Sequence, residues 1–236
     1  MPARAPALAQ ASTRSRLMPG TSLKVIRASK AGPCRALRAV AASISGPRLA
    51  HVTLGPRDDD PLEIAITPSG LNKGHLSVDK LLIVRDEADP KKHPDGLVPS
   101  AETIIHQTVY RTLPEAGAVF HVHPVYATLI SRYFGDPVKP ESFKVEWFEM
   151  MKGVGIGEEE MSDVMVLPNW QDVSLIGRDL RAYIESAKTK VLPAVLVYNH
   201  GLTAWGRTTE AARNHLEIIE YVCQYLYLRR LADPQG

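Results

Sequence analysis

Two histidines separated by one residue, His121 and His123, are the sharpest chemical feature of the sequence. They lie in residues 118–123, a mostly apolar stretch that we expect to form a buried β-strand. Side chains alternate along a strand, so the two imidazoles would point to one face while Val122 turns to the core. Imidazoles held in this way can form half of a metal site. The alternative is a pair of polar positions on a half-exposed strand.

A third histidine, His200, directly follows residues 194–198, which consist almost entirely of β-forming side chains. A strand end delivers side chains to a cleft, and Gly201 would permit a sharp turn that leaves His200 projecting. Three histidines with an open fourth position are expected of catalytic rather than structural zinc. The alternative for His200 is a cap bonded to backbone. We expect His106 and His215, in the middle of helices, to be packing or surface residues.

Two loops carry groups that suit a phosphate. The loop from Thr67 to Gly74 contains Ser69, Gly70 and Lys73, which would present backbone N–H groups and a cation. Ser100 stands at the start of a predicted helix, where further N–H donors and the positive helix end are available. Each pattern is also that of a common turn or cap, but together with a metal site they indicate a phosphorylated small substrate.

A carboxylate and an amine, Glu149 and Lys152, are three residues apart. On a helical turn they would share a face. The alternative is an ordinary surface ion pair.

Alternating strands and helices must position these residues. We expect strands at residues 62–66, 81–84, 118–123 and 194–198. We expect four helices: one that starts after Ser100 and ends before Pro114, one at residues 126–133, one that starts after Asp172, and one at residues 209–230.

The last predicted helix has one apolar stripe with steps of four and three residues, formed by Ala212, Leu216, Ile219, Cys223 and Leu226. Tyr221, Tyr225 and Leu228 widen this stripe beyond what one neighbour covers. Either the helix contributes to a subunit contact, or it lies deep between the sheet and other helices.

Composition divides the 236-residue chain into a basic leader and an acidic body. Residues 1–57 hold ten of the 28 basic residues and none of the 26 acidic ones, so they carry +10 and the remainder carries −8. We interpret residues 1–57 as a disordered or misassigned leader, with an organellar transit peptide as the alternative, and residues 58–236 as the folded domain. An acidic body argues against nucleic-acid binding, and no apolar run is long enough to span a membrane. Only two cysteines occur, so we expect a cytoplasmic protein without disulfides.

In this order, the pieces resemble the class II aldolase/adducin family, and within it the dehydratases that act on a methylthio-pentulose phosphate. The stretches that carry the resemblance are residues 66–74, 100–103, 149–153 and 199–206, within residues 61–227. The Glu-Met-Met-Lys-Gly element at 149–153 resembles the dehydratases rather than the aldolases.

The resemblance implies an α/β fold, namely three α/β/α layers with a mainly antiparallel central sheet, often assembled as a homotetramer. It implies Zn²⁺ on His121, His123 and His200, and dehydration of 5-methylthioribulose 1-phosphate in methionine salvage. It further implies that Glu149 is the general acid/base, assisted by Lys152, and that the loops of Ser69, Gly70 and Lys73 and of Ser100 hold the phosphate. Glu102 matches a position near the metal that is catalytic in aldolase relatives.

The sequence departs from the family at a glycine-rich turn of the phosphate pocket. Residues 17–22 resemble the first half of that turn, but Leu23 and Lys24 stand where the family has Gly-Asn. The departure leaves open an inactive or truncated dehydratase, and two rival functions stay open as well. One is aldol cleavage or epimerisation of another sugar phosphate with Glu102 as the base, and the other is a metal-free interaction module similar to the adducin head.

Overall fold

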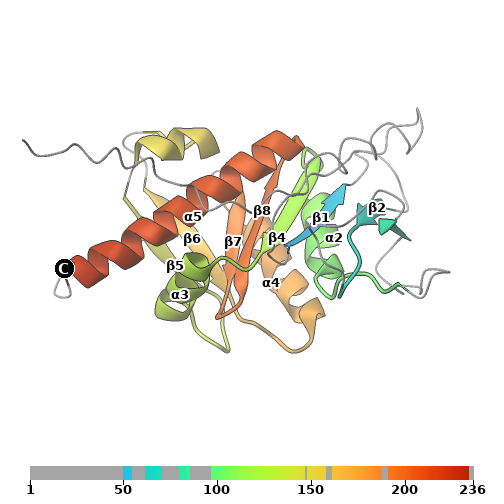
Figure 1. Ribbon diagram of the computed structural model, residues 1–236, viewed down its shortest axis with the longest axis horizontal. Helices are drawn as coiled ribbons and strands as arrows, with labels where there is room; N and C mark the ends of the chain where they lie inside the picture. The colour runs from blue at the N-terminus through green and yellow to red at the C-terminus, as the bar shows by residue number, and fades with distance from the viewer. Residues whose placement is uncertain are drawn as a thin grey trace, which may run out of the picture.

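One eight-stranded sheet with helices on both faces forms the described part of the chain in this computed structural model (Figure 1). The structure describes residues 50–54, 62–70, 80–85, 97–146, 148–157, 161–187 and 191–233. The strands are β1 (Ala50–Leu54), β2 (Glu63–Ile66), β3 (Leu82–Arg85), β4 (Ala118–Val122), β5 (Glu141–Val145), β6 (Ser162–Leu167), β7 (Ala194–Val197) and β8 (Gly201–Gly206). The helices are α2 (Thr103–Thr112), α3 (Val125–Phe134), α4 (Val173–Ser186) and α5 (Thr209–Ala232), and a 3₁₀ helix, η3, spans Glu149–Val154.

The strand order is β3-β2-β1-β4-β8-β7-β6-β5, and every neighbouring pair is antiparallel except β6 and β7. This confirms the expected α/β fold with a mainly antiparallel sheet. Strand β4 lies at its centre, between β1 and β8.

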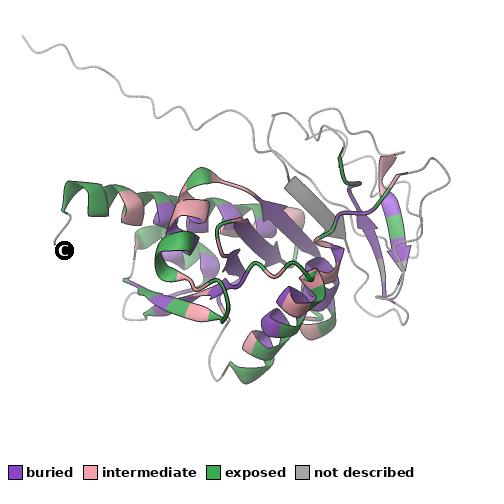
Figure 2. Cartoon of the chain, turned by 90° about the horizontal axis from the view of Figure 1, so that it is seen from below, coloured by how far each residue is buried: buried purple, intermediate pink, exposed green. Residues whose placement is uncertain are grey.

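Alternation along β4 separates two hydrophobic cores. Phe120 and Val122 pack on one face with buried residues of α3 and α5, such as Ile130 and Ile219. Val119 faces the opposite side, in the core that receives α2 and α4. The sheet is therefore the middle of three layers, and its buried strands show as purple between the helices in Figure 2. His121 and His123, in phase with Val119, point toward the layer that contains α2.

The predicted strands and helices are present, with ends shifted by one or two residues for most of them. Asp172 caps α4 as expected, since its side chain accepts a hydrogen bond from the Ser174 backbone N–H. In contrast, α2 begins with Glu102 as its N-cap residue, so Ser100 lies before the helix rather than capping it.

Four strands were not predicted: β1, β5, β6 and β8. Strand β1 pairs with both β2 and β4, so the sheet includes residues that we assigned to the leader, and the domain begins before residue 58. Residues 1–49, including positions 17–24 of the departing turn, lie outside the described residues.

The last helix extends over 24 residues, two beyond the predicted end. Its stripe packs on the sheet through Ala212, Leu216, Ile219 and Cys223. Tyr221, Tyr225 and Leu228 remain 39–46% exposed, which contradicts deep burial of the whole helix within the chain. In the part of the chain that the structure describes, no helix combines the length and apolar character needed to cross a membrane.

Candidate metal centre

Three histidines and one glutamate converge at the end of β4. One ligand atom from each of Glu102, His121, His123 and His200 lies within 4.8 Å of the others. Nε2 of His123 is 3.0 Å from Nε2 of His121 and 2.9 Å from Nε2 of His200. The structure thus brings together the three predicted ligands, which come from β4, from the residue after it, and from the turn between β7 and β8.

The turn that carries His200 is fixed by its own backbone and by α3. Asn199 has a φ of 48°, a left-handed conformation that Asn tolerates better than most residues. The Ser131 hydroxyl accepts a hydrogen bond from the Asn199 backbone N–H, and the Thr128 hydroxyl donates one to the His200 carbonyl. Helix α3, which starts just after His123, therefore also holds the backbone of His200.

Gly201 has a different role from the one that the sequence suggested. The left-handed residue of the turn is Asn199, and Gly201 is required because two strands approach closely. A Cβ at Gly201 would lie 2.2 Å from the Val122 carbonyl oxygen and 2.9 Å from Cδ2 of His123. The absence of a side chain at this position lets β8 begin directly against the histidine pair.

Glu102 enters the cluster from the N-cap position of α2. Its Oε1 lies 3.9 Å from Nε2 of His200, and its side chain is only 14% exposed. The Ser100 hydroxyl donates a hydrogen bond to the Glu102 carboxylate and accepts one from the Glu102 backbone N–H at 3.2 Å. Ser100 therefore orients this carboxylate.

The environment favours neutral imidazoles. Burial lowers the pKa of His123, and the proximity of His200 lowers it further, while Glu102 acts in the opposite direction. Burial likewise lowers the pKa of His200, again opposed by Glu102. A neutral imidazole has a free lone pair on one nitrogen, which is the form that binds metal ions.

The donor set fits a divalent cation. A tetrahedral zinc ion with bonds of 2.0–2.1 Å separates its ligand nitrogens by about 3.3 Å, so the observed separations of 3.0 and 2.9 Å need only a small expansion. Three imidazoles and a carboxylate suit zinc and several other divalent ions. His121, His123 and His200 would hold the cation, with Glu102 beside it.

The two predicted phosphate loops lie next to each other. Pro68 forms an antiparallel bridge with Pro99, and the Ser69 backbone N–H donates to the Val98 carbonyl at 2.8 Å. This bridge places Ser69 and Gly70, both exposed, beside the segment that leads to Ser100. Ser100 itself is 4% exposed. Lys73 lies outside the described residues.

Glu149 and Lys152 lie on η3, away from the histidine cluster. The two side chains form an ion pair at 2.9 Å and are 76% and 56% exposed, respectively. Lys152 lines a surface pocket together with Trp205 and Arg207, at the end of β8 opposite His200. Because β8 has six residues, its two ends are roughly 15–20 Å apart. Within one chain, Glu149 therefore does not face the cluster.

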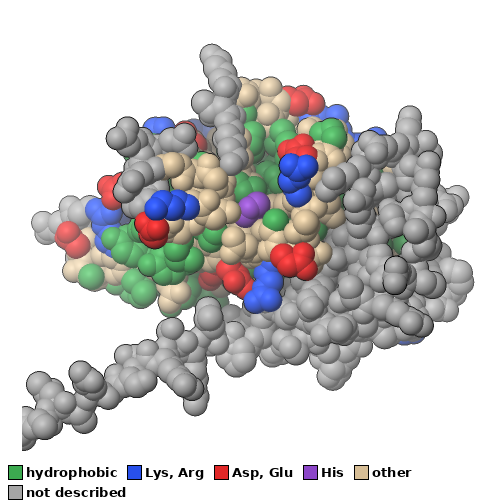
Figure 3. All heavy atoms as spheres, turned by 90° about the horizontal axis from the view of Figure 1, so that it is seen from above, with side chains coloured by type: hydrophobic (Ala, Val, Ile, Leu, Met, Phe, Trp, Pro, Cys, Tyr) green, Lys and Arg blue, Asp and Glu red, His purple; other side chains and the backbone are tan. Residues whose placement is uncertain are grey.

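Figure 1 shows this separation. In Figure 1 the yellow η3 lies near the start of α5, whereas α3 lies toward the opposite end of the strands. Figure 3 looks onto the face that carries η3, where charged side chains and a histidine gather. His215 lines the pocket on this face, and its Nδ1 lies 2.6 Å from the Trp205 carbonyl oxygen.

A profile of the class II aldolase and adducin N-terminal domain matches residues 40–227. The chain therefore belongs to the class II aldolase/adducin family, as the sequence motifs indicated. The match begins within residues 1–57, in agreement with the position of β1.

Several curated relatives of this chain are named methylthioribulose-1-phosphate dehydratases. The methylthioribulose-1-phosphate dehydratase of Microcystis aeruginosa is 37% identical over 172 residues, which cover 72% of this chain and 81% of the relative. That of Serratia proteamaculans is 36% identical over 179 residues, covering 75% and 83%. The resemblance to the dehydratases of the family is confirmed.

Solved structures agree on the fold. An L-fuculose 1-phosphate aldolase superposes with a TM-score of 0.58 and 21% identity, covering 78% of this chain and 77% of that one. The L-fuculose-1-phosphate aldolase of Thermus thermophilus superposes with a TM-score of 0.56 and 23% identity, covering 81% and 89%. At these identities the likeness shows the fold alone.

Proposed function

We propose that the chain is a zinc-dependent hydro-lyase that converts 5-methylthioribulose 1-phosphate to 5-methylthio-2,3-dioxopentyl phosphate, in the methionine salvage of the cytoplasm. The observation that carries the proposal is the convergence of Glu102, His121, His123 and His200 beside two hydroxyl-bearing loops. The dehydratases at 36–37% identity supply the reaction and the substrate.

The cation would be held by His121, His123 and His200. Burial lowers the pKa of His123 and His200 and so favours the neutral, ligating form of these two imidazoles. When bound, zinc supplies Lewis acidity, which stabilises the negative charge that develops on the substrate oxygens as a proton leaves carbon. Glu102 places a negative charge on the same side, where it can orient a substrate hydroxyl or accept its proton.

The phosphate would rest against the bridged loops. Ser69 and Gly70 are exposed there and offer backbone and hydroxyl donors, and Lys73 would add a cation. The Ser100 hydroxyl already serves the Glu102 carboxylate, so Ser100 would contribute to the phosphate site by placing the start of α2, whose N-terminus favours an anion.

Dehydration requires removal of the C3 proton and departure of the C4 hydroxyl as water, after which the enol becomes a 2,3-diketone. We assign the proton transfers to Glu149, with Lys152 stabilising its carboxylate. Since Glu149 lies at the other end of the strands from its own cluster, it would act in the site of a second copy of the chain.

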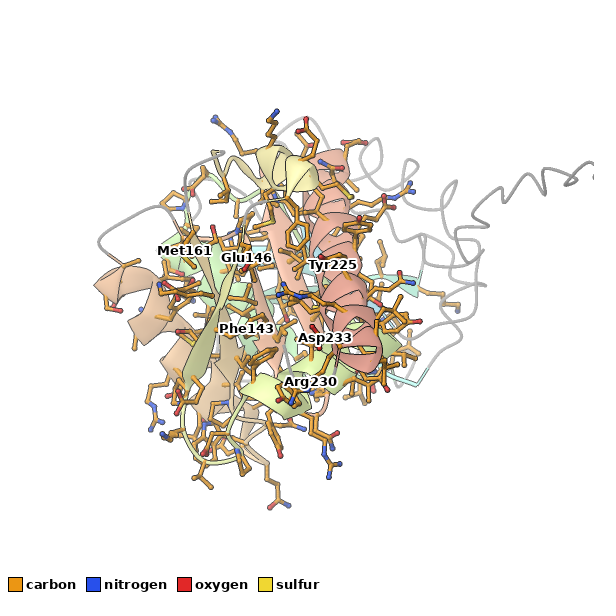
Figure 4. All side chains as sticks on the ribbon, turned by 90° about the vertical axis from the view of Figure 1, so that its left-hand side faces the viewer. Phe143, Glu146, Met161, Tyr225, Arg230 and Asp233 are labelled. Carbon is orange, nitrogen blue, oxygen red and sulfur yellow. The ribbon has the colours of Figure 1, made fainter. Side chains whose placement is uncertain are left out.

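An oligomer, which we infer to be a homotetramer, is supported by apolar side chains that remain exposed on α5. Figure 4 shows Tyr225 and Arg230 on the C-terminal half of α5, beside Phe143 and Glu146. Tyr225 contacts the ring of Phe148, just before Glu149, with ring centroids 4.8 Å apart. A subunit contact at Tyr225 would therefore also act on the segment that carries Glu149.

The test is metal analysis combined with a dehydratase assay on wild type and on His121→Ala. We expect about one zinc ion per wild-type chain, with release of the diketone phosphate, and loss of both in His121→Ala. His215→Gln, which removes a histidine at the other end of β8, should keep its metal. A wild-type protein that binds no metal would contradict the proposal and favour the metal-free interaction module.

A second candidate function is aldol cleavage or epimerisation with Glu102 as the base. One observation favours it: Glu102 lies within the cluster, whereas Glu149 of the same chain does not. Incubation with several ketose 1-phosphates distinguishes the two reactions. Release of a triose, or inversion at a carbon without loss of water, would replace the dehydratase assignment.

A further inference from the structure

Thr203 contacts His121 on the side of its ring that faces away from His123 and His200. Its Oγ1 lies 2.8 Å from Nδ1 of His121, the ring nitrogen that faces away from the other two histidines. Both side chains are fully buried. Thr203 and His121 are also direct cross-strand partners between β8 and β4, so their backbones hold the two side chains on one face of the sheet.

This contact constrains which nitrogen of His121 carries the proton. A neutral imidazole has one N–H donor and one acceptor nitrogen, and a hydroxyl can accept a hydrogen bond. If Nδ1 donates to Thr203, then Nε2 has a free lone pair, directed at the point where the nitrogens of His123 and His200 meet.

We propose that Thr203 is a positioning residue of the metal centre: its hydroxyl accepts the Nδ1 proton of His121, which fixes the ring and keeps Nε2 available to the cation. This inference rests on the proposed function, because it takes the cluster to be a metal site. Metal-bound histidines generally depend on such a partner on the second nitrogen, and its loss typically weakens metal binding 10- to 100-fold.

The ring of His200 lacks the kind of contact that Thr203 makes with the ring of His121. Nδ1 of His200 is buried and has no hydrogen-bond partner within the described part of the chain. His200 is instead held through its backbone by Thr128. Thr203 is thus a side chain that fixes the ring of a ligand directly. It lies in a central strand, paired on both sides, where neither its backbone nor its β-branched side chain can readily move.

The first test reads the tautomer of the folded, zinc-loaded wild-type protein. Long-range ¹H–¹⁵N correlation spectra of histidine-labelled protein, assigned with His121→Gln, should show the proton on Nδ1 of His121. The proton should exchange slowly, as its burial requires. A His121 ring that is protonated on Nε2 would overturn the proposal whatever the variants do.

The second test measures zinc affinity by competition with a chromophoric chelator. Thr203→Val removes the hydroxyl but keeps the shape, and we expect its zinc affinity to fall about 10- to 100-fold. Thr203→Ser should restore affinity to within about threefold, because the acceptor returns. Thr108→Val is the matched control: it removes another buried threonine hydroxyl, one that donates to the Ile104 carbonyl of α2, and should leave affinity unchanged.

Failure of this inference is distinguishable from failure of the metal site. Equal zinc affinity of Thr203→Val and wild type would overturn the role of Thr203 and leave the zinc centre intact. A wild-type protein without affinity for zinc would overturn both. Should Thr203→Val not fold, the wild-type tautomer and the affinity of Thr203→Ser still decide the question.

Discussion

Oε1 of Glu102 lies 3.9 Å from Nε2 of His200, so the N-cap residue of α2 brings a carboxylate to the histidine cluster. The two groups influence each other: Glu102 favours protonation of His200, and burial opposes it more strongly. Because folding lowers the pKa of His123 and of His200, protonation of these two histidines is coupled to the stability of the metal-free protein, which can be measured.

The stability of the metal-free protein should fall on acidification. The pKa of His123 and that of His200 are lowered by folding, so the folded state binds fewer protons than the unfolded chain. Their contribution to stability is present above the pKa of an unfolded histidine and is lost as the pH falls through the lowered, folded-state pKa. Urea titrations of chelator-treated protein should show a smaller free energy of unfolding at about pH 5 than at about pH 7. His123→Gln should flatten this dependence, and an unchanged slope in that variant would contradict the assignment.

Replacement of Glu149 should affect turnover and leave metal binding intact. We expect Glu149→Gln to lower kcat by about 10²–10⁴-fold, because that is the usual contribution of a general acid or base. Zinc content should match wild type, since Glu149 is not part of the cluster. Glu217→Gln is the matched control, because Glu217 also forms an exposed ion pair, with Arg213 at 2.7 Å. Unchanged dehydration by zinc-loaded Glu149→Gln would remove Glu149 from the reaction.

Two inactive variants should complement each other. If each site combines the histidines of one chain with Glu149 of another, then co-assembly of His121→Ala with Glu149→Gln recreates intact sites. In a random equal mixture, about a quarter of the sites receive both native groups. The specific activity of the co-expressed mixture should approach that fraction of wild type, whereas separately purified variants mixed without subunit exchange stay inactive. No activity in verified hetero-oligomers would show that Glu149 does not act between chains.

Gly201→Ala should damage the metal centre through the backbone. The added Cβ would collide with the Val122 carbonyl, so β8 or β4 must move and shift His123 or His200. We expect a loss of about 1–3 kcal/mol in stability, as for other overpacked sites, together with weaker zinc binding. Gly153→Ala is the control, because its Cβ would meet the flexible end of Ile218 at 2.5 Å. Denaturant titration and chelator competition measure the two effects, and equal zinc affinity in the two variants would contradict this account.

The sequence predicted that His121, His123 and His200 lie together, but it did not predict the side-chain contacts that hold them. Alternation along β4 is local, so the shared face of His121 and His123 follows from their spacing alone. The contact between Glu102 and His200 depends on how α2 docks against the sheet, which no local pattern encodes. The hydroxyls of Thr128, Ser131 and Thr203 were missed for the same reason, because their partners are distant in sequence.

The missed strands have two different causes. In β1, Ala50, Val52 and Leu54 alternate with His51 and Thr53, a period of two that the surrounding basic composition obscured. In β8, a glycine stands at each end of the six residues from Gly201 to Gly206, and glycine is depleted in strands. The position of Glu149 relative to the cluster could not be predicted at all, because it depends on the three-dimensional path of the strands between η3 and α5.

The hydroxyls of Thr128 and Ser131 on α3 determine which substitutions the metal centre can tolerate. Helix α3 begins at Val125, two residues after His123, and its hydroxyls bind the backbone of the turn that carries His200, so a displacement of this helix would move both imidazoles together. Substitutions on the exposed side of α3 can therefore leave the spacing between the imidazoles of His123 and His200 unchanged. Loss of the Thr128 or Ser131 hydroxyl would instead let the two imidazoles move apart.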